Sequence, residues 1–309
     1  MAELTAVLLG AVLVFVFGWN NSAFLIGNGR GSGALTVREA LLVSSVGLIL
    51  GVVFEGSSMS KSLAGSLTPT ATDQVVIIAL AVSLVLTVAL TLVKLPVSFS
   101  MVLVGAFCGA VIANNLPLNL GRVEEVVGFW AVAPLATALL AFLIMRLIVR
   151  SVSGLSLIAL DGVSRYAVIL TSFAVAYVLG ANNIGLIYGT VVNGGSSSDS
   201  TAILFTLVAI AGMVALGTGG VSGTIGDRLL VLSPLAVVST FLASAALLWL
   251  GTDLEIPISL TQCLIGGMFG AALSKQDSGV NTRLAAENVA SWLVAPASAL
   301  VLAFVLVRL

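Results

Sequence analysis

The sequence predicts an all-α integral membrane protein with about ten membrane segments, arranged as two inverted repeats that contain broken or re-entrant helices. The 309 residues are 59% hydrophobic and 8% charged, with a mean hydropathy of +1.21, whereas a soluble domain carries about 25% charged residues. The apolar residues form long unbroken runs rather than alternating segments of about ten residues, which argues against a β-barrel. The third observation behind this fold class is an internal duplication.

Ten apolar stretches fall into two groups of five, on either side of a connection at residues 146–165. Helices suit them because backbone N–H and C=O groups in lipid must be paired within the segment. The fourth stretch of each half is shorter than the roughly 20 residues needed to cross, which predicts a re-entrant or broken helix. The stretches lie at 4–17, 40–54, 74–93, 101–113, 126–149, 166–179, 201–216, 229–250, 262–272 and 293–307.

Five motifs recur in the second half, in the same order and within one residue of a constant spacing. The motif that begins at Gly18 recurs at Gly180, and a Pro-Val-Ser motif at Pro96 recurs as Pro-Ile-Ser at Pro257. The other pairs are Gly56 and Gly65 with Gly217 and Gly226, 104–110 with 265–271, and 130–134 with 292–296.

This duplication predicts one transmembrane repeat over residues 1–150 and a second over residues 151–309. Duplicated halves are typical of secondary transporters. Five segments per half is an odd number, so the second repeat would enter the membrane from the opposite side. The parity argument holds only if the short fourth stretch crosses the membrane.

The few ionisable residues narrow the function further. The chain has 12 Lys and Arg, 13 Asp and Glu, and no His, so it lacks both a basic run for a nucleic-acid partner and the commonest acid–base group and metal ligand. Arg146, Arg150 and Arg165 cluster at the mid-chain connection, which predicts that it is cytoplasmic. Cys108 and Cys263 are expected to be buried apolar residues. We expect no metal centre, no cofactor beyond a coupling ion, and no enzymatic activity.

Adjacent asparagines flanked by glycines stand inside apolar surroundings once in each half. Such a segment is expected to unwind at membrane depth, where carbonyls and amide side chains bind a cation or a substrate. The alternative is that the amides only join helices. Glu55 is also a candidate for binding the ion, because a carboxylate inside the membrane is a functional candidate by default. The candidate ion-binding residues are Asn20, Asn21, Asn182, Asn183 and Glu55, of which Asn21 and Asn183 are also candidates for binding substrate.

Hydroxyl residues follow Pro96 and Pro257 at the start of the fourth stretch of each half. A helix that begins inside the protein points unpaired N–H groups and its positive dipole end at whatever lies in front of it. Two such helices near the midplane would hold one tetrahedral oxyanion with uncharged donors. Ordinary capping at a loop is the alternative. The candidate substrate-binding residues in these turns are Ser98, Ser100, Ser259, Thr261 and Gln262.

The order of these motifs resembles the PiT-type inorganic phosphate transporters, a family that includes a bacterial sulfate permease. The resemblance runs over nearly the whole chain. The residues that carry it are the Gly-x-Asn-Asn motifs, the run Gly31–Thr36, Phe54-Glu55-Gly56, and the Pro-Val-Ser and Pro-Ile-Ser-x-Thr motifs. It implies phosphate symport across the cell membrane by alternating access, driven by Na⁺ or H⁺. It also implies that the paired asparagines, the hydroxyls and Glu55 lie at the transport site.

Departures from the family pattern bear on the substrate. The family reads Gly-Ala-Asn-Asp in both halves, whereas Asn21 and Asn183 replace the two aspartates, so the carboxylates best suited to bind Na⁺ or carry a proton are absent. The family's Pro-Val-Ser-Thr-Thr-His likewise ends here in Met101 and Gln262. A carboxylate would repel fully ionised sulfate, whereas an Asn carbonyl can still accept the proton of phosphate.

Phosphate is the first expectation because it is the commoner substrate of the family that the chain resembles, and sulfate is the alternative that the chemistry of the two asparagines favours. An anion channel is the alternative mechanism, and an intramembrane enzyme is disfavoured by the lack of His and of paired carboxylates. Apart from a small inorganic oxyanion, the only expected partner is the lipid bilayer. The sequence leaves open whether the chain forms a homodimer.

Overall fold

The computed structural model describes residues 1–59, 66–92, 98–192, 199–217, 233–275 and 282–309, and these residues are almost entirely helical. Among them, seven helices are long and apolar enough to cross a membrane and three more are shorter apolar helices, which confirms the prediction of about ten segments. The elements are α1 (Ala2–Leu25), α2 (Gly27–Gly31), α3 (Val37–Met59), α4 (Asp73–Leu92), α5 (Phe99–Ala113), α6 (Leu120–Val152), α7 (Leu157–Leu179), η1 (Gly180–Ile184), α8 (Gly185–Val192), α9 (Asp199–Leu216), α11 (Pro234–Asp253), α12 (Leu260–Lys275) and α13 (Thr282–Arg308).

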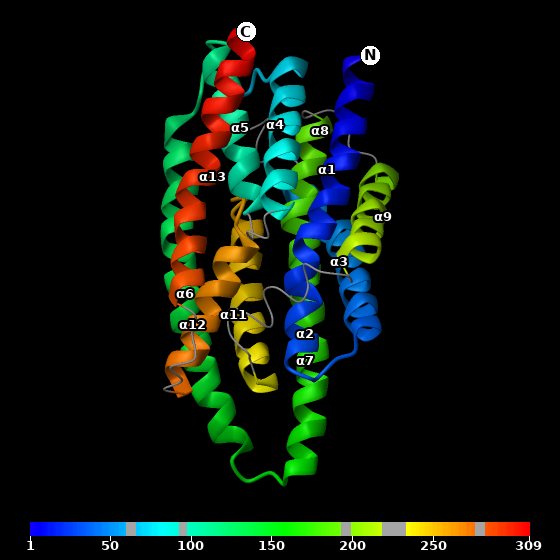
Figure 1. Cartoon of the computed structure of the whole chain (residues 1–309), viewed down its shortest axis with the longest axis vertical. Helices are drawn as coiled ribbons and strands as arrows, with labels where there is room; N and C mark the ends of the chain where they lie inside the picture. Colours follow the sequence, from blue (N-terminus) through cyan, green and yellow to red (C-terminus); the bar gives the residue numbers. More distant parts are fainter. Residues whose placement is uncertain (60–65, 93–97, 193–198, 218–232, 276–281) are drawn as a thin grey trace.

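The two halves run in opposite directions along the long axis. Figure 1 shows both chain termini at one end of the molecule and the α6–α7 connection at the other end. The short helices α5 and α12, here called the half-helices, both begin near mid-height. From there α5 lies toward the end that carries the chain termini, and α12 lies toward the α6–α7 connection. The inverted repeat and its re-entrant helices are therefore confirmed. The boundary between residues 150 and 151, which falls in the last turn of α6, stays a prediction.

Glycines bring each half-helix into backbone contact with the last helix of the other repeat. A Cβ added to Gly105 of α5 would lie 2.4 Å from the Pro296 carbonyl oxygen of α13, and one added to Gly266 of α12 would lie 2.2 Å from the Pro134 oxygen of α6. No larger residue fits at such distances, and close backbone packing of this kind is typical of membrane helices. Gly105 and Gly266 are repeat equivalents, as are Pro134 and Pro296, so the duplication is visible in the packing itself.

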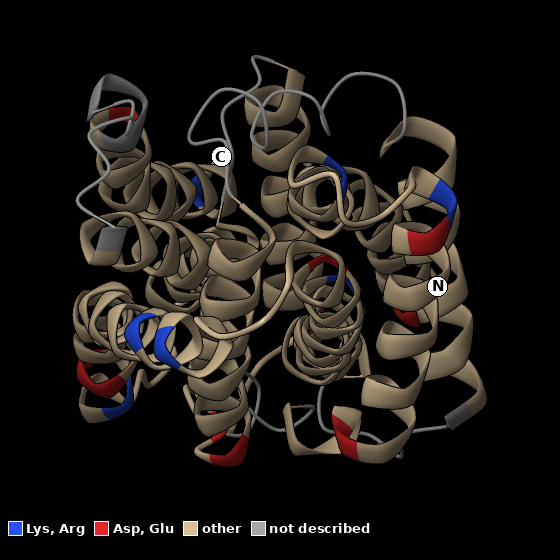
Figure 2. Ribbon diagram, turned by 90° about the horizontal axis from the view of Figure 1, so that it is seen from below, with Lys and Arg blue, Asp and Glu red and all other residues tan. Residues whose placement is uncertain are grey.

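Charged side chains are sparse, and Figure 2 shows the helices almost free of them. Arg165 near the start of α7 pairs with Glu39 near the start of α3 at 2.5 Å, which joins the two repeats. Cys108 and Cys263 are buried free thiols, as expected. The cytoplasmic placement of the α6–α7 connection stays a prediction. Of the matched motifs, Gly65, Pro96, Val97 and Gly226 lie outside the described residues.

Candidate functional site

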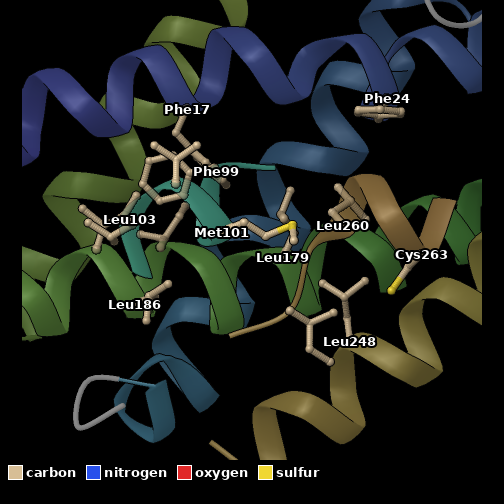
Figure 3. Close-up of a cluster of buried hydrophobic side chains, with 14 of the residues drawn as sticks. Phe17, Phe24, Phe99, Met101, Leu103, Leu179, Leu186, Leu248, Leu260 and Cys263 are labelled. Atoms are coloured by element: carbon tan, nitrogen blue, oxygen red, sulfur yellow. The ribbon is translucent and has the colours of Figure 1, made fainter. Parts of the chain in front are cut away.

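The half-helices α5 and α12 meet at their first turns in the interior of the bundle. The Oγ of Ser100, in the first turn of α5, donates a hydrogen bond of 2.8 Å to the carbonyl oxygen of Ile258, which precedes the start of α12. Figure 3 shows Phe99 of α5 and Leu260 of α12 within one cluster of buried side chains. The first turns of the two predicted half-helices are therefore in direct contact.

The hydroxyls at this meeting point differ in their hydrogen bonds. Ser98 is the N-cap residue of α5 and is 2% exposed, and its Oγ has no hydrogen-bond partner within the described chain. The Oγ of Ser259 accepts the N–H of Gln262 at 3.2 Å, which leaves its O–H proton available to donate. Ser100, in contrast, donates its proton to the Ile258 carbonyl. Ser98 and Ser259, which are repeat equivalents, are thus the two hydroxyls best able to donate to a ligand.

Thr261 and Gln262 complete the first turn of α12, and each is 2% exposed. The Oε1 of Gln262 is buried and finds no hydrogen-bond partner in the described part of the protein. A carboxamide carries an acceptor oxygen and two donor hydrogens, and a rotation exchanges their positions. This side chain can therefore turn its N–H groups toward an anion without breaking a bond made by its oxygen.

The first asparagine pair does not unwind its helix, so the sequence prediction is wrong in the first repeat. Asn20 and Asn21 lie in the continuous helix α1. The Nδ2 of Asn21 donates to the Phe17 carbonyl one turn back at 3.0 Å, which satisfies the amide within the helix. Gly18 serves packing instead of unwinding, because an added Cβ would lie 1.8 Å from the Ala209 carbonyl oxygen of α9.

The second pair deforms its helix without unwinding it. Asn182 and Asn183 lie in η1, a π-helical turn that links α7 to α8. Such turns interrupt the regular hydrogen-bond ladder and are frequent at functional sites. Gly180 at the start of this turn again packs tightly, with an added Cβ only 2.4 Å from the Leu48 carbonyl oxygen. The repeats therefore share the glycine contact and differ in the backbone at the asparagines.

Asn20 and Asn182 each donate a hydrogen bond to a threonine at the equivalent position of their repeats, but the bonds of their amide oxygens differ. The Nδ2 of Asn20 donates to Thr91 Oγ1 at 2.9 Å, and the Nδ2 of Asn182 donates to Thr252 Oγ1 at 3.1 Å. The Oδ1 of Asn182 accepts the N–H of Ile258 at 3.2 Å, which ties it to the start of α12. The Oδ1 of Asn20 is buried and has no partner among the described residues, an arrangement that proteins seldom leave unoccupied.

Glu55 is half-buried on α3 and lies near the second asparagine pair. Its Oε1 accepts a hydrogen bond of 3.0 Å from the hydroxyl of Tyr177 on α7. Met59, one turn further along α3 and on the same helix face, has its sulfur 3.7 Å from the Nδ2 of Asn182. No hydrogen bond joins Glu55 to the hydroxyls of α5 or α12 in the described chain. The hydrogen bond to Tyr177 thus places the Glu55 carboxylate at the contact between α3 and α7.

Sequence reasoning missed Thr91, Thr252, Tyr177 and Trp130. The two threonines occupy equivalent positions of the two repeats, so a full alignment of the repeats would have found them. Tyr177 corresponds to Phe15 in the first repeat and carries no such signal. Trp130 donates its indole N–H to the Pro257 carbonyl at 2.7 Å, a long-range contact that its place in an apolar helix does not reveal.

Comparisons with known proteins agree with this fold. The sequence model of the phosphate transporter family matches the chain twice, over residues 17–160 and 158–303. A protein of Methanocaldococcus jannaschii named as a phosphate permease is 25% identical, over 96% of this chain and 94% of its own length. A sulfate permease of Bacillus subtilis is 23% identical, over 99% of this chain and 88% of its own length. The solved structure of a sodium-dependent phosphate transporter is 20% identical and superposes with a TM-score of 0.87, covering 99% of this chain and 98% of that one.

Proposed function

The chain belongs to the phosphate transporter family, and from this premise we propose that it carries inorganic phosphate by cation-coupled symport with alternating access. The observation that carries the proposal is the meeting of the α5 and α12 N-termini, one from each repeat, with Ser98 and Ser259 at their caps. Inverted repeats that build one central site are the usual framework for alternating access. The division into repeats at residues 1–150 and 151–309 is part of the proposal.

The site binds the anion with neutral groups. Two helix N-termini supply main-chain N–H groups and partial positive charge, and the two serine hydroxyls add one donor each. Hydrogen bonds to a charged group contribute about 1.5–3 kcal/mol each, net of the hydrogen bonds lost to water, so several of them together can hold an anion without a cationic side chain.

The coupling ion is Na⁺ or H⁺, and two residues separate the choices. The Oδ1 of Asn20, buried without a partner among the described residues, is an oxygen of the kind that coordinates Na⁺ in transporters. An amide oxygen does not take up a proton near neutral pH, so this atom favours Na⁺. Glu55 is a carboxylate and is able to carry a proton. The solved relative, described as sodium-dependent, supports Na⁺.

Sulfate is the second candidate substrate because Asn21 and Asn183 replace the family's aspartates. Both asparagines are buried, at 6% and 2% exposure, so a carboxylate at either position would repel a fully ionised sulfate strongly. The similarity to a sulfate permease supports this candidate. The uptake assay below distinguishes the two anions through competition.

The test is uptake of radiolabelled phosphate into proteoliposomes, with Na⁺ replaced by K⁺ or with an imposed pH gradient. We expect Ser98→Ala combined with Ser259→Ala to abolish uptake, because both free donors are lost. Ser151→Ala is the matched control, since its exposed hydroxyl only bonds the Leu147 carbonyl one turn back. Uptake by the double variant at the level of this control would refute the proposal that the Ser98 and Ser259 hydroxyls bind the anion.

Two further arms separate the alternatives. Unlabelled sulfate that displaces phosphate uptake at lower concentration than unlabelled phosphate would make sulfate the substrate. Counterflow separates a transporter from an anion channel, because only a transporter accelerates exchange when substrate is present on the far side. Absence of counterflow with intact anion flux would overturn the symport mechanism while leaving the anion site in place.

A further inference from the structure

Side chains bind five consecutive carbonyls in the connection between α11 and α12. This connection runs through Pro257 and is not helical, so its carbonyls lack the N–H donors that a continuing helix would supply. Its carbonyls accept from Arg122 at Leu254 (3.0 Å) and Glu255 (2.9 Å), from Asn182 at Ile256 (3.3 Å), from Trp130 at Pro257 (2.7 Å) and from Ser100 at Ile258 (2.8 Å). Three of these four side chains come from the first repeat. The start of α12 is thus positioned largely by the opposite half of the molecule.

The repeat equivalents of two of these groups have no such partner. Trp130 and Trp292 occupy equivalent positions of the two repeats and are buried alike, at 7% and 8% exposure. Trp130 donates to the Pro257 carbonyl, whereas the Trp292 Nε1 donates to no acceptor in the described chain. In the same way the Oδ1 of Asn182 accepts the Ile258 N–H, while the Oδ1 of Asn20 lacks a partner there.

A buried indole N–H and a buried amide oxygen that are both unpaired are unfavourable. The groups equivalent to the Pro257 carbonyl and the Ile258 N–H belong to Pro96 and Val97, which lie outside the described residues. Within the described residues, Trp130 bonds the start of a half-helix and Trp292 does not.

We infer that Trp130 is a positioning residue that holds the α12 half of the anion site in the conformation seen here. The inference rests on the proposed transport function only in calling this region the anion site, since the bond itself is independent of transport.

According to this inference, the indole N–H of Trp130 positions the start of α12, and the packing of its ring does not. Phenylalanine keeps an aromatic ring at the position and removes the N–H. Trp130→Phe should therefore loosen the start of α12 in the state seen here, whereas Trp292→Phe should leave it unchanged. The two substitutions are chemically identical and occur at equally buried sites, so each is the control for the other.

Cys263 in the first turn of α12 reports on this loosening without any need for transport. It is 0% exposed, and in a Cys108→Ala background it is the only thiol of the chain. The measurement is the rate at which a small maleimide labels Cys263 in purified protein, without substrate. Loss of one hydrogen bond of average strength corresponds to about a fivefold change in an opening equilibrium. We expect Trp130→Phe to be labelled about fivefold faster than the parent and Trp292→Phe to match the parent.

Equal labelling rates in the parent and Trp130→Phe, or equal acceleration by both substitutions, would overturn the inference. Size-exclusion profiles establish that the variants are folded. If Trp130→Phe does not yield folded protein, Ser100→Ala removes the neighbouring bond to the Ile258 carbonyl and must accelerate labelling in its place. The phosphate uptake assay is scored separately, so a chain that carries no phosphate but shows this asymmetry would refute the proposed function and leave the positioning role standing.

Discussion

Replacing Gly270 with alanine tests whether backbone packing between α12 and α6 stabilises the fold. The alanine Cβ would lie 1.9 Å from the carbonyl oxygen of Ala138 and 2.7 Å from its carbonyl carbon, whereas ordinary contact begins at 3.4 Å. The helices must therefore separate locally by about 1.5 Å to restore van der Waals contact. Overpacking costs about 1–3 kcal/mol. We expect a cost of about 3 kcal/mol, at the upper end of this range, because a backbone atom cannot rotate out of the way.

Gly128 of α6 provides the matched control, since an added Cβ there meets no atom within 4 Å. Alanine at this position should be neutral or stabilising by up to about 1 kcal/mol, as helix propensity favours it over glycine. Thermal unfolding of purified protein, followed by size-exclusion chromatography, measures the difference. At about 2–4 °C per kcal/mol, Gly270→Ala should unfold about 6–12 °C below the parent.

The repeat supplies an internal check on the same reasoning. Gly109 of α5 is the equivalent of Gly270, and its added Cβ would lie 2.1 Å from the Leu300 carbonyl oxygen of α13. Gly109→Ala should therefore lower the unfolding temperature by a similar amount. Unfolding of Gly270→Ala at the temperature of Gly128→Ala would refute the claim that the half-helices are held by direct backbone contact.

Two more substitutions test the ion and the substrate. Glu55→Gln removes the carboxylate that accepts a hydrogen bond from the Tyr177 hydroxyl. We expect phosphate uptake into proteoliposomes to lose its dependence on the cation gradient or to stop. Unchanged ion dependence would show that Glu55 has no role in coupling. Asn21→Asp with Asn183→Asp restores the carboxylates of the family pattern. We expect sulfate to lose at least tenfold in competition against phosphate, because two like charges near 4 Å repel by about 4 kcal/mol at an effective dielectric constant of 20. An unchanged competition ratio would show that these side chains do not face the anion.

The fold was predictable because the duplication leaves a local record in the sequence. Gly105 and Gly266 lie in matching apolar runs, and both turned out to contact the other repeat. The first turns of α5 and α12 were predictable for the same reason, since proline followed by hydroxyl residues marks a helix start without any knowledge of tertiary contacts. The roles of the predicted site residues stay predictions, although their burial and grouping fit them.

Long-range contacts account for what the sequence did not reveal. Gly18 beside the first asparagine pair looked like a helix breaker, and only its contact with the Ala209 backbone shows that close packing requires it. The Tyr177–Glu55 hydrogen bond joins α7 to α3 and has no counterpart in the first repeat. Trp130 resembles any aromatic residue of a membrane helix until its partner at Pro257 is known. In each case the deciding partner lies in the other repeat, far away in the sequence.

The contacts between the repeats divide into two classes with different consequences for transport. The glycine contacts of α5 with α13 and of α12 with α6 are the same in both halves, although the halves differ in their polar bonds. A contact that is equal in both halves does not distinguish one facing state from the other. The bond from Trp130 to the Pro257 carbonyl is of the other class, because it depends on a single directed N–H. In the proposed transport cycle, a change of facing state should therefore alter such a polar bond more readily than the glycine contacts, so that each half-helix stays packed on its glycine-matched partner and moves with it as one unit.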